Sequence, residues 1–460
     1  MGRLRTVHRC TECGAASPRW TGRCPGCGAW NSLVEEVEQA TPASGGASGR
    51  SGGADRRMVP GERPIPLVDV EAGGGEPMPT GMAELDRVLG GGLVPGSVTL
   101  LAGEPGIGKS TITLQAAGSV AEVGRRVLLV SAEESKVQVR ARAERLGVLA
   151  PTLWVAAETC LPDVLAGLSE VEPHLCVVDS VQMLHDPALE SAPGSVAQVR
   201  QCATRLVEAA KSSGTAVIMI GHVTKEGAVA GPRVLEHVVD TVLSFEGDRH
   251  HALRMVRTVK HRYGAAGELG MFEMTGDGLV GVADPSRLLL ADRQPDLSGS
   301  VVLPAIEGGR PLLVEVQALT VNNDNPATLR RSAQGLDSGR LQMVLAVLGR
   351  HLDLRFGTED VYTSVVGGVR VGEPAADLAV MAALLSARHL SSVGGDTIAF
   401  GEVGLGGEVR SVVHAERRLA EAARLGFRRA LVPNSAPDGP EGLELVRVGD
   451  VRQLLHALRL

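Results

Sequence analysis

Residues 103–110 of the chain are Gly103-Glu104-Pro105-Gly106-Ile107-Gly108-Lys109-Ser110. They match the pattern G-x-x-x-x-G-K-S, in which the backbone N–H groups of a glycine-rich loop surround the phosphates of a nucleotide. An apolar run precedes the loop at residues 98–102, and a run that favours a helix follows it at residues 111–117. The motif requires a strand before it and a helix after it, so we predict a nucleoside triphosphate site on an α/β fold.

The residue types in this loop indicate separate roles. Lys109 is expected to reach the β- and γ-phosphates, and the Ser110 hydroxyl is expected to bind Mg²⁺. The positive end of the helix that follows favours the same phosphates. ATP and Mg²⁺ are therefore the predicted cofactors. The residues expected to contact the nucleotide are Gly103, Glu104, Pro105, Gly106, Ile107, Gly108, Lys109, Ser110 and Thr111.

Length and composition exclude several classes of protein. The chain has 460 residues, which indicates about two to four domains. Its formal net charge is −7, so it is not a uniformly basic protein that coats nucleic acid, and DNA contacts must come from local basic patches. Aromatic residues make up 2% of the chain, which predicts that charge, rather than stacking on aromatic rings, dominates any binding of single strands.

The sequence also indicates a compartment. No apolar run approaches the roughly 20 residues that span a membrane. The N-terminus lacks the apolar core of a secretory signal. We therefore expect a cytoplasmic protein with no membrane partner.

Four of the seven cysteines lie near the N-terminus as two pairs, Cys10-x2-Cys13 and Cys24-x2-Cys27. Two pairs at this spacing are typical of a zinc ion held by four thiolates. A segment of about 30 residues cannot build a stable core alone, so bound Zn²⁺ would supply its folding free energy. We predict a four-cysteine zinc knuckle over residues 1–37. Two disulfides are the alternative, which a cytosolic chain disfavours.

The predicted knuckle is locally basic, with five arginines against Glu12 over residues 1–30. This charge permits a DNA contact and fits a protein-docking module equally well. Trp20 and Trp30 are expected to pack the knuckle rather than to stack on bases. The linker that follows is placed at residues 38–65, is rich in small residues and is expected to be flexible.

Residues 66–285 show apolar runs that alternate with helical patterns. The runs at residues 126–131, 175–180 and 215–220 are expected to be buried parallel strands. Ligands of such sheets bind outside the carboxyl ends of the strands. We therefore expect the polar residues at these strand ends to lie near the phosphate loop.

The carboxylates at these strand ends have predicted roles in hydrolysis of the nucleotide. Asp179 is expected to hold Mg²⁺ through water. Glu133 is expected to polarise the attacking water, with Glu134 as the alternative. Lys109 completes the set of side chains expected to act on the phosphates.

The segment before the loop contains Thr80-Gly81, Glu84-Leu85-Asp86 and Gly90-Gly91-Gly92. Together with the phosphate loop and the strand that ends at Asp179, it resembles the RecA superfamily of ATPases. Within that superfamily the chain is most similar to the bacterial DNA repair family called RadA or Sms, which carries an N-terminal four-cysteine knuckle. The family motif Lys-Asn-Arg-Phe-Gly corresponds to Lys260-His261-Arg262-Tyr263-Gly264, which keeps both cations and an aromatic residue.

The resemblance implies how hydrolysis would be coupled to DNA. In a ring of subunits, expected to be a hexamer, Lys260 and Arg262 would stabilise charge on the neighbour's γ-phosphate. A solvated strand edge is the alternative interpretation of these two cations. His222 would stand between the nucleotide and a glycine-rich DNA-binding loop, in which Lys225 and Arg233 would contact phosphates. The implied partners are single-stranded and branched DNA and the RecA recombinase.

Residues 286–460 change to a mixed α+β pattern, with an expected strand at 311–316 and an expected helix at 340–352. This region resembles the proteolytic domain of Lon-type proteases, which uses a serine nucleophile activated by a lysine. Ala375 and Glu416 occupy the two corresponding positions, so peptide hydrolysis is not expected and a scaffold for ring assembly is implied. Six residues of this scaffold are candidates for a basic surface, with a solvated helix as the alternative: Arg410, Arg417, Arg418, Arg424, Arg428 and Arg429.

The sequence thus predicts a DNA-stimulated ATPase that processes recombination intermediates by branch migration. Its predicted fold is an α/β RecA-like core with an N-terminal zinc knuckle and a C-terminal Lon-protease-like α+β domain. Two other classes stay open. One is an ATP-driven protease, which Ala375 and Glu416 oppose. The other is a nucleotide-switched regulatory protein, although such relatives often carry two ATPase cores and this chain has a single phosphate loop.

Overall fold

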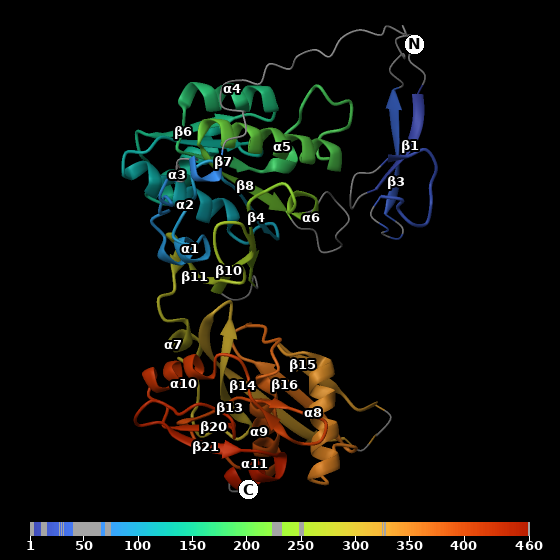
Figure 1. The fold of residues 1–460 in the computed structure, drawn as a ribbon, viewed down its shortest axis with the longest axis vertical. Helices are drawn as coiled ribbons and strands as arrows, with labels where there is room; N and C mark the ends of the chain where they lie inside the picture. Colours follow the sequence, from blue (N-terminus) through green and yellow to red (C-terminus); the bar gives the residue numbers. More distant parts are fainter. Residues whose placement is uncertain are drawn as a thin grey trace. The chain divides into compact units, whose positions relative to one another are not determined.

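The computed structural model describes residues 4–10, 16–26, 28, 30, 32–39, 66–69, 75–222, 232–247, 253–323, 325 and 328–458. The chain divides into two compact units, which can be followed by colour in Figure 1. Unit 1 comprises Met1–Glu246, Val256–Ala266 and Met274–Gly281. Unit 2 comprises Gly247–Met255, Gly267–Glu273 and Val282–Leu460.

A small antiparallel sheet occupies the N-terminal part of unit 1. Its strands β1 (Leu4–Cys10), β2 (Ala16–Ser17) and β3 (Leu33–Gln39) lie in the order β2-β1-β3. Cys10 pairs with Leu33 across the sheet, and both residues are buried together with Cys24. Two of the three residues in this buried cluster are cysteines, which fits a segment stabilised by a metal rather than by an apolar core.

A nine-stranded sheet has the order β12-β11-β10-β9-β4-β8-β7-β5-β6, and its strands from β9 to β6 lie in unit 1. The strands from β9 to β6 in this order pair in parallel. β4 and β5 are buried at every position, as expected of parallel strands covered on both faces. The strands are β4 (Val98–Gly103), β5 (Val127–Ser131), β6 (Leu153–Ala157), β7 (Leu175–Asp179), β8 (Ala216–His222), β9 (Thr241–Glu246), β10 (Leu253–His261), β11 (Leu269–Thr275) and β12 (Gly278–Gly281).

Helices cover both faces of this sheet. Residues Val98, Leu100 and Ala102 of β4 lie in an apolar cluster with α4 and α5, so the alternate residues of the strand face the other side. On β5 and β7 that other side is covered by α2. The helices are α1 (Ala83–Val88), α2 (Lys109–Glu122), α3 (Lys136–Arg145), α4 (Leu161–Val171), α5 (Val196–Ser213) and α6 (Pro232–Leu235), with short 3-10 turns η1 (Leu67–Asp69) and η2 (Val181–Met183).

Unit 2 contains a seven-stranded mixed sheet in the order β15-β16-β14-β13-β17-β20-β21. Its long hairpin, β13 and β14, turns at Gly308 and Gly309, whose φ angles of 63° and 127° favour glycine. The strands are β13 (Ser300–Glu307), β14 (Arg310–Asn322), β15 (Arg331–Gln334), β16 (Glu359–Val365), β17 (Thr397–Ala399), β20 (Arg429–Pro433) and β21 (Glu444–Val448), beside a small pair β18 (Glu402–Val403) and β19 (Val409–Arg410).

The helix α9 (Ala376–His389) is buried along most of its length and packs on β13 and β14. It is apolar on nearly every side, which is typical of a helix enclosed by other elements. The other helices of this unit are α7 (Pro285–Leu289), α8 (Ser338–His351), α10 (Ala415–Arg424) and α11 (Val451–Ala457).

These elements confirm the α/β fold class. The runs predicted as strands at residues 126–131, 175–180 and 215–220 correspond to β5, β7 and β8. The expected strand at 311–316 is the first half of the longer β14, and the expected helix at 340–352 corresponds to α8. Of the helices in the described part of the chain, none combines the length and apolar character that crossing a membrane requires.

Candidate active site

The phosphate loop lies between β4 and α2, at the carboxyl end of a buried parallel strand. Gly106 and Gly108 have φ angles of 76° and 118°, in the left-handed region that glycine favours. A Cβ on Gly108 would also lie 2.8 Å from Met274 Cε. Glycine at these positions therefore allows the backbone to curl around a bound phosphate.

Lys109 begins α2 and is only 3% exposed. Its Nζ donates to the backbone oxygens of Gly103 and Glu104, each at 2.8 Å. Burial lowers the pKa of this ammonium group, and the nearby charges of Asp179 and Glu133 oppose the shift. The cation thus lies within the loop, where phosphate oxygens can replace the two carbonyl acceptors.

Asp179 ends β7, and its carboxylate meets the loop. Burial raises the pKa of the Asp179 carboxyl above its usual value, and a hydrogen bond from the Ser110 hydroxyl offsets only part of this rise. The two predicted Mg²⁺ ligands therefore touch, although they come from different elements. A hydroxyl and a carboxylate are the hard oxygen donors that Mg²⁺ prefers.

Glu133 follows β5, and two donors hold one of its carboxylate oxygens. The hydroxyl of Ser180, a fully buried residue, donates to Glu133 Oε1 at 2.5 Å, and His222 Nε2 lies 3.1 Å from the same oxygen. Burial raises the pKa of this carboxyl, but the hydrogen bonds from Ser180 and His222 outweigh it and lower the pKa overall. Glu133 is therefore an ionised, oriented carboxylate beside Lys109 and Asp179.

Glu134 is oriented differently from its neighbour. Its Oε1 forms an ion pair with Arg142 Nη2 of α3 at 2.5 Å. The Glu134 side chain therefore links the segment after β5 to α3. This arrangement favours Glu133 over Glu134 as the carboxylate available to a water molecule.

The predicted DNA contacts lie at the edge of the described structure. His222 is the last residue of β8, and its ring contacts Glu133 as described above. Lys225 lies outside the described residues. Arg233 belongs to α6, but its side chain lies outside what the structure describes.

The two cations of the predicted ring motif are held at the end of β10. Lys260 Nζ donates to the backbone oxygens of Glu236 and Val239 at 2.6 and 2.8 Å. Arg262 Nη1 lies 3.0 Å from Asp240 Oδ1, and the Asp240 side chain is 1% exposed. In the sheet, β9 separates β10 from β4, the strand that leads into the phosphate loop.

The structure describes two of the four cysteines that are predicted to bind zinc. Cys10 and Cys24 are buried together, and the backbone N–H of Gly26 donates to Cys24 Sγ at 3.3 Å. An N–H donated to sulfur favours the thiolate form, so these residues fit a zinc ligand set. Cys13 and Cys27 lie outside the described residues.

The tryptophans of this module do not behave as expected. Trp20 is 56% exposed and Trp30 is 73% exposed. The expectation that both rings pack the knuckle is therefore wrong. Among the described residues of the module, the buried apolar cluster consists of Cys10, Cys24 and Leu33 and contains neither indole.

Comparisons with known proteins match the two parts of the chain that contain these residues. A family model described as an AAA domain matches residues 62–228, and one described as a rubredoxin metal binding domain matches residues 8–35. The DNA repair protein RadA of Pseudomonas aeruginosa is 48% identical over 465 residues, which cover 100% of each chain. The RadA proteins of Halalkalibacterium halodurans and Bacillus subtilis are 43% and 42% identical, each over 99% of both chains.

The chain belongs to the RadA family of DNA repair proteins. This membership confirms the family inferred from the phosphate loop, the cysteine pairs and the Lys260–Gly264 motif. The AAA domain supports ATP hydrolysis in general, and the metal binding domain contains all four cysteines of the predicted zinc knuckle.

In the C-terminal part of this RadA family member, the position predicted for a catalytic lysine needs correction. Glu416 is exposed on α10, whereas Arg418 is fully buried on the same helix. Arg418 Nη2 lies 2.5 Å from Glu373 Oε2, two residues before Ala375, and Nη1 donates to Pro304 O. Arg418, rather than Glu416, therefore faces the segment of Ala375, and an arginine held in an ion pair is no general base.

The same contacts correct the predicted basic surface. Arg418 is buried and therefore is not part of a basic surface. Arg410 forms an ion pair with Glu408, and Arg424 forms ion pairs with Asp284 and Glu421. The positive charge of these three arginines is thus largely balanced within unit 2.

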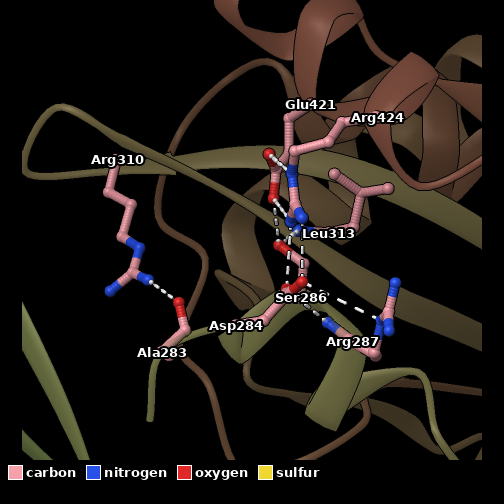
Figure 2. Close-up of polar contacts among 8 residues, drawn as sticks. All are labelled: Ala283, Asp284, Ser286, Arg287, Arg310, Leu313, Glu421 and Arg424. Atoms are coloured by element: carbon pink, nitrogen blue, oxygen red, sulfur yellow. Dashed lines mark hydrogen bonds and ion pairs between the residues drawn. The ribbon is translucent and has the colours of Figure 1, made fainter. Parts of the chain in front are cut away.

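The ion pairs of Arg424 belong to a polar cluster that joins α7 to α10 (Figure 2). Arg424 bonds both oxygens of Asp284, at 2.8 and 3.0 Å. Ser286 Oγ donates to Glu421 Oε1 at 2.7 Å and accepts the backbone N–H of Leu313 at 3.1 Å. The hydrogen bond from Arg424 lowers the pKa of Asp284 to about 2.

Asp284→Asn is expected to lower the free energy of unfolding of unit 2 by about 1 kcal/mol at pH 7. The full pKa shift would give more, but Arg424 is 48% exposed and solvent screens the pair. Because the folded-state pKa is depressed, this stabilisation is present above about pH 4 and disappears as the pH falls toward 2. Thermal unfolding at pH 7 and pH 3 should therefore show a smaller gap at pH 3. The exposed Asp292→Asn is the control, and an equal gap at both pH values would contradict the assignment.

Sequence reasoning missed Ser180 as a functional residue. It is 47 positions from Glu133, and the sequence offers only the weak signal of a serine directly after the strand-ending Asp179. It also missed Asp240 as the partner of Arg262. Both contacts depend on the order of strands in the sheet.

Proposed function

We propose that this chain is a DNA-stimulated ATPase in which a DNA-binding loop controls a water-activating carboxylate. The contact between Glu133 and His222 is the observation that supports it most directly. His222 ends β8 at the start of the segment predicted to bind DNA. A change in that segment would reach the carboxylate through a single side chain, and DNA would thereby alter hydrolysis.

The residues around the loop would divide the chemistry of ATP hydrolysis. Lys109 and the backbone N–H groups of residues 103–111 would bind the phosphates. Ser110 would hold Mg²⁺ directly and Asp179 through water, and the bound ion offsets charge on the phosphate oxygens. Glu133 would orient the attacking water and accept its proton.

We further propose that the subunits act in a ring, expected to be a hexamer. Lys260 and Arg262 would then act on the γ-phosphate held by a neighbouring subunit. Their present acceptors, which are backbone oxygens and Asp240, hold both cations in place at the end of β10. An ATP-bound neighbour would compete for these donors.

The proposed substrates are single-stranded and branched DNA, with Lys225 and Arg233 as phosphate contacts. The motor would extend recombination intermediates by branch migration together with the RecA recombinase. Membership of the RadA family of DNA repair proteins supports a role on DNA. The protein would work in the cytoplasm.

We propose four modules along the chain. A knuckle over residues 1–37 would bind Zn²⁺ through Cys10, Cys13, Cys24 and Cys27, and a linker would follow at 38–65. The ATPase core would occupy 66–285, and a scaffold related to Lon-type proteases would occupy 286–460. Ala375 and the buried Arg418 support a scaffold without peptidase chemistry.

Single-stranded DNA is expected to raise ATP turnover of the wild-type protein, and Lys260→Ala is expected to remove most of that increase. A cation supplied to a neighbour's phosphate is worth about 10³- to 10⁵-fold in related enzymes, so a loss of at least tenfold is expected here. The measurement is steady-state phosphate release across a DNA titration. Lys136→Ala, which removes an exposed cation at the start of α3, is the matched control. Turnover that stays flat across the titration would contradict DNA stimulation, and normal stimulation of Lys260→Ala would contradict the role in the ring.

A further inference from the structure

Two exposed tryptophans define an unassigned surface on the N-terminal module. We propose that the exposed indoles of Trp20 and Trp30 each stack on unpaired bases of single-stranded DNA. The chain has three tryptophans, all of them more than half exposed, and two of the three lie on this small module. An indole combines a large apolar face with a polar N–H group, which is why tryptophan is enriched at binding surfaces.

The structure holds the Trp30 ring in position. Trp30 forms a backbone bridge with Arg23, and the Arg23 guanidinium lies over the indole at 5.9 Å from the ring centroid. Arg23 Nε also donates to Gly28 O at 2.9 Å, which anchors the guanidinium. Gly22 lies beneath the ring edge, where an added Cβ would come within 3.8 Å of the indole. An anchored indole loses little conformational entropy when a base stacks on it.

The charges nearest the two indoles favour a nucleic acid over an acidic or apolar protein surface. Residues 16–30 contain Arg19 and Arg23, both exposed, and no acidic residue. Of the four glutamates in residues 1–39, three lie in the sequence of β3 as Glu35, Glu36 and Glu38, and the fourth is Glu12. Flat rings flanked by guanidinium groups suit bases joined by phosphates.

Charge alone would not bring DNA to this module. Residues 1–39 carry five arginines against four glutamates, so the electrostatic attraction of the whole module is weak. The contribution of this surface to binding is therefore expected to come from stacking and to depend little on salt. A weak dependence on salt would distinguish this stacking from the phosphate contacts proposed for the DNA-binding loop. The inference rests on the proposed function and adds to it the contact made to single strands.

The test uses full-length, zinc-loaded protein carrying Trp154→Phe, without nucleotide. Trp20 and Trp30 are then the remaining indoles. A thymidine oligonucleotide of roughly 12 nucleotides, within the site sizes of small single-strand-binding modules, is expected to quench their emission. An oligonucleotide of equal length with abasic sites is expected to leave the emission unchanged, because it presents phosphates without bases. Equal quenching by both oligonucleotides would overturn the proposal.

Affinity for a labelled oligonucleotide provides the second measurement. Loss of one stacked base weakens affinity by about 5- to 150-fold. The double variant Trp20→Ala/Trp30→Ala is therefore expected to bind the oligonucleotide at least about fivefold more weakly. Trp20→Phe/Trp30→Phe keeps aromatic rings and is expected to stay within a few-fold of wild type. Zinc content equal to wild type shows that the module is folded. If Trp30→Ala loses zinc, Trp20→Ala alone decides the result.

The remaining outcomes also decide between the two kinds of partner. Unchanged DNA affinity in the folded alanine variant would overturn the proposal. Unchanged DNA affinity together with weaker binding of the RecA recombinase would identify the surface as a protein-docking site instead. Because no nucleotide is present, a failure of DNA to stimulate ATP turnover would leave this measurement valid, and the two proposals can fail separately.

Discussion

Replacing Lys109 with alanine is expected to lower ATP turnover at least about a hundredfold. The ammonium group is the charged donor enclosed by the loop, and it lies beside both Asp179 and Glu133. Removing a preorganised donor to developing phosphate charge typically costs about 10²- to 10³-fold in rate. Steady-state phosphate release, with and without single-stranded DNA, measures the loss.

Lys211→Ala is the matched control for this substitution. Lys211 is an exposed cation near the end of α5, just before β8 begins, whereas the phosphate loop follows the carboxyl end of a strand. Its loss is expected to leave turnover unchanged. Turnover within a few-fold of wild type in Lys109→Ala would contradict the assignment of residues 103–111 as the ATP site.

Glu133→Gln is expected to lower the rate of hydrolysis by about 10²- to 10⁴-fold while ATP still binds, because the loss is that of a general base. Glutamine keeps the shape of the side chain and an oxygen that can accept from Ser180, so the site should stay assembled. The low pKa of Glu133 means that its carboxylate is ionised well below neutral pH. The loss of rate should therefore be the same from pH 6 to pH 8. Single-turnover hydrolysis and binding of a fluorescent ATP analogue separate the two steps.

Glu134→Gln distinguishes the two adjacent carboxylates. Glu134 is paired with Arg142 in the last turn of α3, so its replacement is expected to loosen this contact and to change turnover only a few-fold. If Glu134→Gln abolished hydrolysis and Glu133→Gln did not, the assignment would be reversed. Equal small effects of both substitutions would show that neither carboxylate activates the water.

Much of the fold could be predicted from local patterns. The loop glycines, the buried apolar runs and the cysteine pairs each depend on residues close together in the chain, so the α/β core and the metal module were predictable. The contacts within the candidate active site were less predictable. The sequence placed Glu133 and Glu134 at the same strand end, and only their partners, Ser180 and Arg142, separate them.

Other expectations failed for the same reason. Six arginines of the C-terminal part were candidates for one basic surface, but Arg418 is buried against Glu373 and Arg424 is paired with Asp284. Trp20 and Trp30 were expected inside the knuckle and lie at its surface. In each case the residue type was informative about its chemistry and uninformative about its partner.

The amino-acid sequence by itself determined that this protein has a phosphate-binding loop on an α/β core and a cysteine-rich module before it. These features are local, because a strand, a tight loop and a helix start need only their own residues and near neighbours. The tertiary structure alone decided that Ser180 and His222 converge on one oxygen of Glu133, from positions 47 and 89 residues away. That convergence follows from the order of β5, β7 and β8 in the sheet, which side-chain packing across the whole core selects.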